Sequence, residues 1–425
     1  MHRFFFLFLP FWFISEKADA QINLKADTVS YSLKDAEILF LKNNFDLLAA
    51  RYQINEAEAA VIQAKLWDNP SFNYEQGAYN RDTKKWFDFS QNGESAVSLQ
   101  QLIYLAGKRN KRINIEKINS QIARYQFYDL MRTLRYELRS SFFELYFLQQ
   151  SLSVYDRELT ALKTLVDAYS VEYQKGNLSF KELARLQALQ FNLDNEKIDV
   201  LKNVNEKQSN LILLTGDSLS RPIKPVFSVS AFDVINPASF NLVQLVDSAL
   251  INRYDLKITE AQIESEQMNL SLQKAMRVPD MTIGGRYDKA GSYVHNYNAV
   301  SLGFDLPLWN RNQGNIRISE NKIEEIKALN NRKELEVKNE ITKAYVQFIE
   351  TDKLYKSSIR KFDSKYDNLF DGLTSAYKDH TISLLEFIDY YETYKDSKNQ
   401  YFQLLNNRLD AIESLNLATG STIIK

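Results

Sequence analysis

Few side chains in this sequence could carry out catalysis or bind a metal directly. The 425 residues include no Cys and only three His, namely His2, His295 and His380. The absence of Cys excludes a disulfide framework, a thiolate zinc site and a cysteine nucleophile. No P-loop, GxSxG or HExxH motif occurs either. The sequence therefore argues against an enzyme and against a metal site built from His within one chain.

The polar pair with the clearest chemistry is acidic. Glu386 and Asp389 are three residues apart in a segment expected to be helical, so both side chains would lie on one helix face. Carboxylates that face a narrow pore attract cations and repel anions. The same spacing is common on an ordinary solvated helix face. The residues alone leave both interpretations open.

The composition indicates a folded chain that is mostly helical. Apolar residues make up 44% and charged residues 25%, which excludes wholesale disorder. Only 12 Gly and 7 Pro serve the whole length, too few for a sandwich or propeller. The formal net charge of -1 offers no global positive field. Nucleic acid is therefore not an expected partner.

Residues 1–20 are typical of a secretory signal peptide. Arg3 precedes the apolar run Phe4 to Ile14, and Ala18-Asp19-Ala20 fits a cleavage site after Ala20. The run is too short to span a bilayer comfortably, so a cleaved signal is favoured over a membrane anchor. No later stretch approaches about 18 consecutive apolar residues, so no transmembrane helix is expected after it.

The remaining sequence is a tandem duplication. Asn43-Asn44-Phe45-Asp46-Leu47 matches Asn252-Arg253-Tyr254-Asp255-Leu256, 209 positions later. Thr215-Gly216 matches Thr419-Gly420, 204 positions later. Self-similarity at a nearly constant offset indicates two copies of one structural unit.

The duplication predicts two structural repeats with the same order of elements. The first covers residues 21–219 and the second 240–425, joined by a non-helical, proline-containing linker over 220–239. Each repeat should contain a helix, a β-hairpin, a long helix, a tight turn and a returning helix. The ranges expected for the first helix are Leu33 to Leu66 and Leu242 to Met276, for the hairpin 71–104 and 281–307, for the turn 176–179 and 380–383, and for the returning helix Phe180 to Leu214 and Leu384 to Leu417.

Alternating polarity marks the strands of each hairpin. Phe72 and Tyr74 alternate with Asn73 and Glu75, and the second hairpin repeats this pattern. Four half-buried strands of a soluble sheet are one interpretation, but two isolated hairpins make a poor soluble sheet. Apolar and polar residues that alternate over about 10 positions also describe a membrane β-barrel. Four strands cannot close a barrel alone, so several chains would have to share one.

A helix of unusual length should follow the first hairpin. Residues Lys108 to Gln174 contain no Gly and no Pro, which predicts a helix on the order of 100 Å at 1.5 Å per residue. Apolar residues at spacings of three and four predict a coiled coil along it. They are Leu138, Phe142, Leu145, Leu148, Leu152, Tyr155, Leu159, Leu162, Val166, Tyr169 and Tyr173. Gly176 suits the left-handed backbone of the reversal that follows.

This ordered set of features resembles the outer membrane efflux protein family, the TolC-type channels. The resemblance covers nearly all of the chain after residue 20. It implies a homotrimer in which four strands per chain form a twelve-stranded outer-membrane β-barrel, in contact with outer-membrane lipid. The long helical coiled-coil hairpins would form a periplasmic α-barrel. The fold class is therefore expected to be mainly α with a small β part.

Two stretches look like the heavy-metal branch of that family, the CzcC- and CusC-like channels. Leu105 to Arg112 follows the second strand, and Leu306 to Asn315 follows the fourth. The Pro, Asn and Gly residues in them also shape a bend between strand and helix, and other branches use similar bends. The assignment to heavy metals and the purely structural interpretation both stay open.

The resemblance implies roles for residues near the second tip. The alignment places Glu386 and Asp389 on the two carboxylates of the family's periplasmic gate. In a trimer they would form two stacked acidic rings, which should resist tight closure and raise the pKa of each carboxyl. Tyr377 and Glu182 fall on positions that link neighbouring helices near the closed tip. Ile382 stands where the family often has a basic residue, so the ionic part of that link is altered.

The helix tips are where the family docks its periplasmic adaptor. The tip residues are Gly176, Leu178 and Ser179 in the first repeat and His380, Thr381, Ile382 and Ser383 in the second. His380 stands where the first tip has Gly176, so adaptor contact is expected to differ there. A solvent-exposed turn His is the simpler interpretation of His380, and a metal-binding ring of three His380 is the alternative.

The predicted function is a passive outer-membrane exit duct of a tripartite efflux system. Its partners would be a periplasmic adaptor (membrane fusion) protein and an inner-membrane RND-type transporter, and it would need no cofactor. The cargo could be heavy-metal cations, drugs or a secreted polypeptide. A soluble periplasmic coiled-coil scaffold is a second alternative. It shares the signal peptide and the heptads but leaves the two alternating hairpins unexplained.

Overall fold

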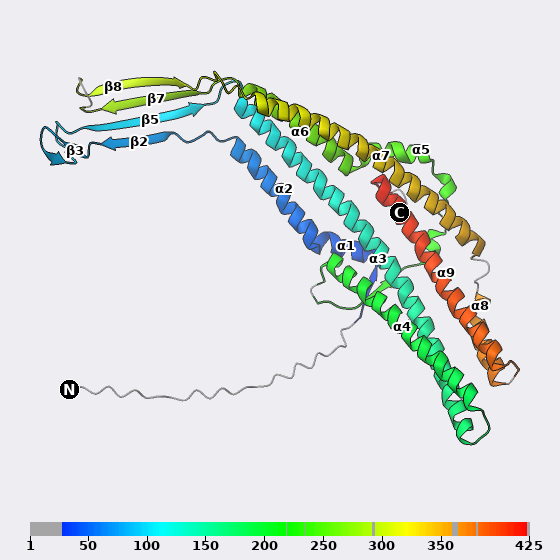
Figure 1. The fold of residues 1–425 in the computed structure, drawn as a ribbon. Helices are drawn as coiled ribbons and strands as arrows, with labels where there is room; N and C mark the ends of the chain where they lie inside the picture. Colours follow the sequence, from blue (N-terminus) through cyan, green and yellow to red (C-terminus); the bar gives the residue numbers. More distant parts are fainter. Residues whose placement is uncertain are drawn as a thin grey trace, which may run out of the picture.

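The computed structural model describes residues 28–217, 219–233, 235–290, 294–358, 364–379 and 381–422, except for the side chains of residues 230, 231 and 364–368. The predicted signal peptide lies outside these residues. Figure 1 shows an elongated molecule with a β-sheet at one end and two helical tips at the other. The predicted class, mainly α with a small β part, is confirmed.

Helices form the body of the molecule. The first repeat contributes α1 (Leu33–Asn43), α2 (Phe45–Ala64), α3 (Lys108–Gln174) and α4 (Phe180–Thr215). The second contributes α5 (Leu242–Asn252), α6 (Tyr254–Ala275), α7 (Gln313–Ser358), α8 (Ser364–Lys378) and α9 (Leu384–Thr419). The helix α3 has the bounds that its lack of Gly and Pro predicts. Among the described residues, none of these helices combines the length and the apolar character that crossing a membrane requires.

One antiparallel sheet unites the two hairpins. Its strands are β2 (Ser71–Gln76), β5 (Ser95–Ile103), β7 (Met281–Asp288) and β8 (Tyr297–Phe304), in the order β2-β5-β7-β8. The central pair β5 and β7 joins the two repeats, from Ala96 opposite Asp288 to Ile103 opposite Met281. Within the described residues β2 and β8 each pair on one side only. A two-residue pair, β3 (Tyr79–Asn80) with β4 (Lys85–Trp86), shapes the β2–β5 loop and was not predicted.

The prediction of one continuous first helix in each repeat is wrong. Asn44 separates α1 from α2 and Arg253 separates α5 from α6. Both residues have extended backbone, with φ/ψ of -62/124° and -68/127°. The Asn44 side chain accepts a hydrogen bond from the Leu47 N–H at 3.0 Å. It therefore starts a new helix as an N-cap, which Asn strongly favours.

These breaks meet the ends of the returning helices. Asn44 Nδ2 donates to the Leu214 carbonyl near the end of α4, and Arg253 Nη1 donates to the Ala418 carbonyl near the end of α9, each at 3.0 Å. Carbonyls at a helix C-terminus have no partner within the helix, and the two side chains supply one. In each repeat, the motif at the helix break therefore lies next to the Thr-Gly motif at the end of the returning helix.

The linker between the repeats contains no α-helix among its described residues, but it does contain other secondary structure. It contains β6 (Ile223–Val226), which pairs in parallel with β1 (Val29–Ser32), and two short 3₁₀ turns, η1 (Val229–Phe232) and η2 (Pro237–Ser239). Phe227 and Phe232 pack on Phe143 of α3, with ring centroids 5.0 and 5.6 Å apart. The linker is therefore part of the core. The β1–β6 pair was not predicted from the sequence.

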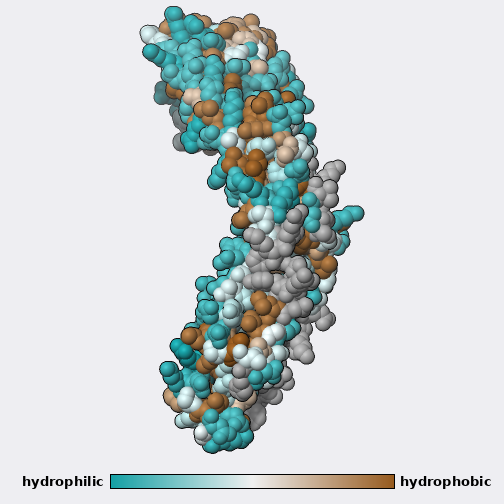
Figure 2. Space-filling view, turned by 90° about the vertical axis from the view of Figure 1, so that its right-hand side faces the viewer, coloured by the Kyte–Doolittle hydropathy of each residue, from teal (hydrophilic) through white to brown (hydrophobic). Residues whose placement is uncertain are grey.

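Two apolar cores follow one another along the rod. The larger surrounds the middle of α3 and includes Leu138, Phe142, Phe348 and Ile412. The smaller lies toward the tips and joins α3, α4, α8 and α9. Most of the predicted heptad residues of α3 lie in these cores, whereas Tyr173 at its end is exposed. Figure 2 shows hydrophobic patches between larger hydrophilic areas along the outside of the rod.

The Gly216 backbone lies close to Asn43, whereas Gly176 lies in open space, so Gly→Ala substitutions at these two positions should differ in their cost to stability. Gly216 has a φ of +64°, and an added Cβ would lie 2.6 Å from the Asn43 carbonyl oxygen. Gly176 has a φ of +78°, but no atom lies within 4 Å of the Cβ position. Gly176→Ala should cost about 1–2 kcal/mol of unfolding free energy from backbone strain alone. Gly216→Ala should cost about 1–3 kcal/mol more because the methyl group overlaps backbone.

Guanidinium unfolding of both variants in detergent, followed by helical circular dichroism, measures the difference. Equal losses would mean that the contact between Gly216 and the α1–α2 break does not constrain the fold.

Candidate functional site

The first helical tip is closed by a C-terminal capping motif. The Gly176 N–H donates to the Tyr173 carbonyl and the Asn177 N–H donates to the Glu172 carbonyl, each at 2.9 Å. This is the Schellman pattern, in which the left-handed residue is usually Gly. The Glu172 carboxylate also accepts from Lys175 Nζ and Asn177 Nδ2, each at 2.7 Å. The tip is therefore a compact turn fixed by its own side chains.

The second tip shares one of these two backbone hydrogen bonds. The Thr381 N–H donates to the Ala376 carbonyl at 2.9 Å, 204 positions after the matching bond of Asn177. His380, the sequence equivalent of Gly176, lies outside the described residues. Ser179 starts α4 without a side-chain cap, whereas Ser383 and Glu386 form a reciprocal capping box at the start of α9. The two tips therefore share a turn but differ in how the returning helix begins.

The predicted gate carboxylates lie on the exposed face of α9. The Glu386 carboxylate accepts from the Ser383 N–H at 2.9 Å and from the Ser383 hydroxyl at 2.8 Å. These bonds lower the pKa of Glu386 in the single chain. Asp389 is exposed and has no hydrogen bond or ion pair among the described residues. The exposed acid Asp396 extends this face along α9 and was not singled out from the sequence.

The predicted linking residue Tyr377 is buried between helices of the same chain. Its ring stacks on Tyr169 of α3 and on Phe387 of α9, with centroids 5.6 and 4.7 Å away. Burial, Tyr169 and the nearby charge of Glu182 all raise the pKa of Tyr377. Tyr377 and Glu182, which belong to different hairpins, are therefore close enough for the charge of Glu182 to act on Tyr377, and their role in linking helices stays a prediction.

The remaining tip residues form the surface at this end of the molecule. Gly176, Ser179, Thr381 and Ser383 are exposed, and Leu178 is half-buried. Ile382 packs on the smaller apolar core rather than facing solvent fully. An apolar residue at this position thus has a packing role, which accounts for the missing basic side chain.

The sheet at the opposite end has two chemically different faces. Cross-strand register aligns apolar residues into rows, such as Phe72, Leu99 and Val300, with Gly285 between the last two. Phe72, Val300 and Leu302 are 68%, 83% and 64% exposed. Such a large apolar surface on a strand face marks a contact with lipid or with another protein.

The other face of the sheet is polar. Glu75, Arg286 and Asp288 lie on it, and Arg286 pairs with Asp288 at 3.2 Å and with Glu75 at 3.8 Å. Ser98 and Gln100 of β5 share this side. Alternation along every strand therefore separates an apolar face from a charged one, as the lipid-facing and lumen-facing sides of a membrane barrel are separated.

A buried acid lies between the two hairpins, well above the tips. Glu158 of α3 is 1% exposed, and neither carboxylate oxygen has a hydrogen-bond partner among the described residues. The nearby Lys395 Nζ instead pairs with Glu196 at 2.7 Å, and the Tyr155 hydroxyl donates to the same carboxylate at 3.1 Å. Burial, only partly opposed by the charge of Lys395 and by the Tyr391 hydroxyl, raises the pKa of Glu158 to about 8. The neutral acid is thus the dominant form at neutral pH.

Sequence reasoning missed Glu158, although a signal was present. The residue stands three positions after Tyr155 and four before Leu162, which places it on the seam of apolar residues along α3. A charged residue at a seam position is either paired or protonated when buried. The neighbour Tyr391 also has a buried hydroxyl without a partner among the described residues.

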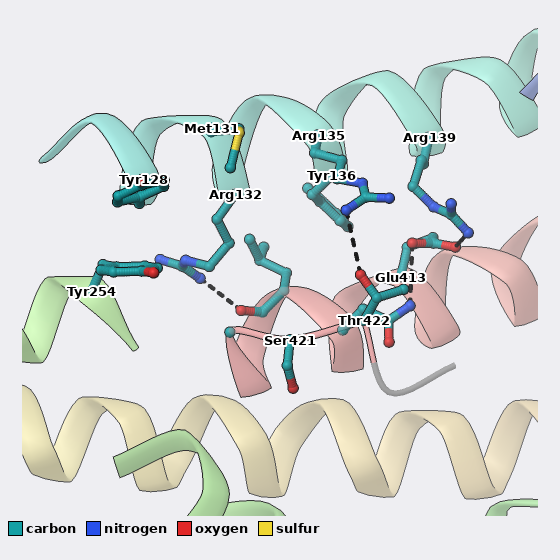
Figure 3. A pocket seen from close by; sticks show the side chains of 13 residues that line it. Tyr128, Met131, Arg132, Arg135, Tyr136, Arg139, Tyr254, Glu413, Ser421 and Thr422 are labelled. Carbon is teal, nitrogen blue, oxygen red and sulfur yellow. Dashed lines mark hydrogen bonds and ion pairs between the residues drawn. The ribbon is translucent and has the colours of Figure 1, made fainter. Parts of the chain in front are cut away.

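An arginine cluster on α3 connects this helix to α1 and α9 in the middle of the rod. Figure 3 shows Arg132, Arg135 and Arg139 projecting from α3 toward the end of α9 around a cavity of about 140 Å³. Arg139 donates to Glu37 of α1 at 3.0 Å and to Glu413 of α9 at 2.6 Å. Burial alone would raise the pKa of Glu37, but hydrogen bonds from Arg135 and Arg139 lower it. Arg132 pairs with Asp129 at 2.7 Å, so the three arginines pair with three carboxylates and the cavity is a structural junction.

No group of three or more His, Asp or Glu that could hold a metal ion occurs among the described residues. What the geometry defines is a channel-type chain: an amphipathic sheet with unpaired edges, attached to long helical hairpins with short tips.

Comparison with known proteins places this chain in a family. The sequence model of the outer membrane efflux protein family matches residues 39–217 and 245–421. The chain therefore belongs to this family, which confirms the resemblance found in the sequence. The matched segments stop at the linker and resume after it.

Three relatives illustrate the similarity. The cobalt-zinc-cadmium resistance protein CzcC of Cupriavidus metallidurans is 22% identical over 67% of this chain, and the match spans 65% of its own length. The CusC structure has a TM-score of 0.74 at 15% identity and covers 93% of each chain. The CmeC outer membrane channel of Campylobacter jejuni has a TM-score of 0.75 at 15% identity, covering 92% of this chain and 87% of its own. None of these three names describes an enzyme.

The arginine cluster predicts a large loss of stability in Arg139→Met. The substitution would leave Glu413, 3% exposed, and Glu37 without their shared buried cation. Such a loss typically costs about 3–5 kcal/mol. The control Arg124→Met removes a pair with Glu58 in which both side chains are about half exposed, and should cost at most about 1 kcal/mol. Similar losses in guanidinium unfolding would contradict a special role for Arg139.

Glu158 predicts a stability that falls as pH rises. The raised folded-state pKa of about 8 means that the folded chain keeps a proton that the unfolded chain releases above about pH 4.5. The unfolding free energy should therefore decrease between those two values. In Glu158→Gln this decrease should vanish, so the unfolding free energy of the variant should rise relative to that of wild type from pH 5 to pH 8.

Thermal unfolding across that range tests the assignment. The exposed Glu324→Gln variant serves as control and should follow wild type at every pH. A constant difference between Glu158→Gln and wild type would show that Glu158 is ionised in the fold.

Proposed function

We propose that this protein is the outer-membrane exit duct of a tripartite efflux system. The observation that carries the proposal is the sheet, whose exposed apolar face and two open edges have no use in a single soluble chain. Membership of the outer membrane efflux family supports the same role. In this role the predicted signal peptide directs export, and the helical part extends into the periplasm.

Closure of the sheet requires further copies of the chain. A strand edge exposes a row of unpaired N–H and C=O groups, which cannot remain unpaired in hydrocarbon. Pairing β2 of one copy with β8 of the next satisfies both edges without any other partner. A homotrimer built in this way has a twelve-stranded barrel, with the apolar face toward lipid and the face of Glu75 and Arg286 toward the lumen. The helical hairpins of the three copies would then continue the lumen as an α-barrel.

The partners follow from the position of the tips. They stand at the far end of the helices from the sheet (Figure 1). Surface residues such as Gly176, Ser179 and Thr381 would contact a periplasmic adaptor, which connects the duct to an inner-membrane RND-type transporter. The capping box of Ser383 gives the second tip a different surface from the first, so the adaptor would meet two kinds of tip.

The cargo proposed is heavy-metal cations. The similarity to CzcC and CusC favours this class, and carboxylate rings would suit cations in transit. A duct for drugs or for a secreted polypeptide is the alternative, and the fold itself is compatible with either. The soluble scaffold is disfavoured by the size of the exposed apolar face.

The gate is assigned to Glu386 and Asp389. Both are exposed on α9 just above the second tip, with Asp396 further along the same face. In a trimer this face would bring like charges together at the narrow end. Repulsion there would raise the pKa of Glu386, against the lowering that Ser383 produces in the single chain. The hydrogen bonds to Ser383 also hold the Glu386 carboxylate at a defined position.

Single-channel conductance in a planar bilayer tests the duct and its gate. Wild type should give small, cation-selective openings that divalent cations reduce. Glu386→Gln/Asp389→Asn should open wider and lose part of the selectivity, because both acidic rings are removed. A matched control, Glu324→Gln/Glu325→Gln, changes two exposed acids of α7 and should conduct like wild type.

The outcomes separate the two parts of the proposal. A pore that the gate substitutions leave unchanged would keep the duct but remove Glu386 and Asp389 from the gate. Folded protein that gives no pore, and that stays monomeric and soluble without detergent, would favour the scaffold.

A further inference from the structure

A collar of four short segments joins the sheet to the helices. It consists of residues 65–70, 104–112, 276–280 and 305–317, which are the connections of α2 to β2, β5 to α3, α6 to β7 and β8 to α7 together with the first five residues of α3 and of α7. Figure 1 shows these connections gathered at one end of the sheet, where α3, α6 and α7 begin or end. The collar is therefore the boundary between the apolar sheet and the hydrophilic rod.

The collar carries a local excess of positive charge. It contains eight basic residues and three acidic ones, whereas the whole chain is nearly balanced with 53 and 54. The basic residues are Lys65, Lys108, Arg109, Lys111, Arg112, Arg277, Arg311 and Arg317, and the acidic residues are Asp68, Asp280 and Asp305. One acid, Asp280, is already neutralised by the buried Lys108 at 2.7 Å.

Several of these cations face solvent without a counter-ion. Arg277, Arg311 and Arg317 are exposed, and no ion pair of theirs occurs within the described residues. Cations also crowd the first turn of α3, which contains no acid, although a helix N-terminus favours negative charge. The fold therefore tolerates an electrostatic cost at the collar that a bound anion would relieve.

Large exposed apolar side chains accompany the cations. Trp309 is 88% exposed and Trp67 59%, and Leu306 and Leu308 are also exposed. Arg109 lies over the Trp67 ring, 4.6 Å from its centroid. Trp beside Arg and Lys is the composition of a membrane–water interface.

The collar continues the apolar face of the sheet. The last cross-strand row of that face is Ile103, Met281 and Phe304, and the chain then passes through Leu306 and Trp309 to Arg311. Polarity therefore changes from aliphatic to aromatic to cationic along one direction. A bilayer shows the same order from acyl chains to headgroups.

The far end of the sheet lacks this excess. The β2–β5 loop, residues 77–94, has three basic residues, Arg81, Lys84 and Lys85, and three acidic ones, and the β7–β8 connection, residues 289–296, adds only the basic residue Lys289. Both ends of a sheet that spans a membrane need polar residues. Only the collar has a clear excess of positive charge, and this excess indicates a surface for anionic headgroups.

We propose that the collar binds the headgroups of anionic phospholipids, such as phosphatidylglycerol, in the leaflet next to the helices. This inference rests on the membrane placement of the sheet proposed above and adds a lipid preference to it. The lipid phosphates would lie between the guanidinium groups of Arg277, Arg311 and their neighbours, with Trp67 and Trp309 at the level of the ester groups.

Fluorescence quenching by brominated lipid tests the preference. The protein, in a Trp86→Phe background that removes the tryptophan at the far end of the sheet, is reconstituted in phosphatidylcholine vesicles. These contain a minor fraction of either brominated phosphatidylglycerol or brominated phosphatidylcholine. Quenching should be stronger with the anionic lipid. The ratio of quenching by brominated phosphatidylglycerol to quenching by brominated phosphatidylcholine should fall roughly fivefold or more in Arg277→Gln/Arg311→Gln. Each basic residue near an anionic lipid surface contributes to the binding free energy, and this variant removes two.

A matched double variant and a soluble anion complete the test. Arg81→Gln/Lys85→Gln removes two exposed cations at the other end and should keep the wild-type ratio. Added inorganic phosphate should also leave the ratio unchanged. Loss of the ratio in phosphate would show a site for free phosphate and overturn the lipid assignment.

The same measurement separates the lipid preference of the collar from the proposed outer-membrane duct. Equal quenching by the two lipids, in vesicles that still conduct ions, would overturn the headgroup preference alone. Absence of quenching by either lipid would mean that the sheet does not enter a bilayer, and would overturn the proposed function as well.

Discussion

The architecture depends on one repeated contact, in which a broken helix covers the end of a returning one. In each half a polar residue at the break, Asn44 or Arg253, donates to a carbonyl at the end of α4 or α9. A left-handed Gly stands beside each contact, and an added Cβ would overlap the Asn43 backbone at Gly216 and the Arg253 side chain at Gly420. This junction sets where the returning helix stops, and so holds the tips at one end of the molecule and the sheet at the other.

Among the described residues, most buried ionisable groups along the rod are paired, whereas Glu158 is buried without an ion pair. Arg139, Arg253 and Arg408 pair with the distant carboxylates Glu413, Glu340 and Asp352, respectively. These groups tie α3, α5–α7 and α9 together across the duplication, and an ion pair removed on one side would leave a costly charge on the other. Glu158 has no ion pair among the described residues, and its burial between the two hairpins favours the protonated form. We therefore expect the packing of the smaller apolar core, around Glu158, to respond to pH.

The two ends of the molecule meet different surroundings. The sheet exposes its apolar rows and leaves two edges open, which suits lipid and further copies of the chain. The tips are polar turns stabilised by local capping, which suits contact with a protein in water. The collar between sheet and helices has features of both, with exposed Trp and Arg at the point where apolar surface gives way to charge. Function in such a chain comes from the order of these surfaces along one axis, not from a cluster of reactive groups.

The sequence by itself determined the elements that depend on local patterns. Absence of Gly and Pro predicted α3, alternation predicted the four strands, and self-similarity predicted two repeats with equivalent tips. Contacts between distant residues could not be predicted in this way. The breaks at Asn44 and Arg253 exist because distant carbonyls require partners, and β1 pairs with β6 across almost 200 residues. Protonation of Glu158 likewise follows from burial by α4 and α9, which no pattern in α3 records. Local propensity sets the helices and strands, whereas desolvation and hydrogen bonding between distant segments decide where they break and which charges survive inside.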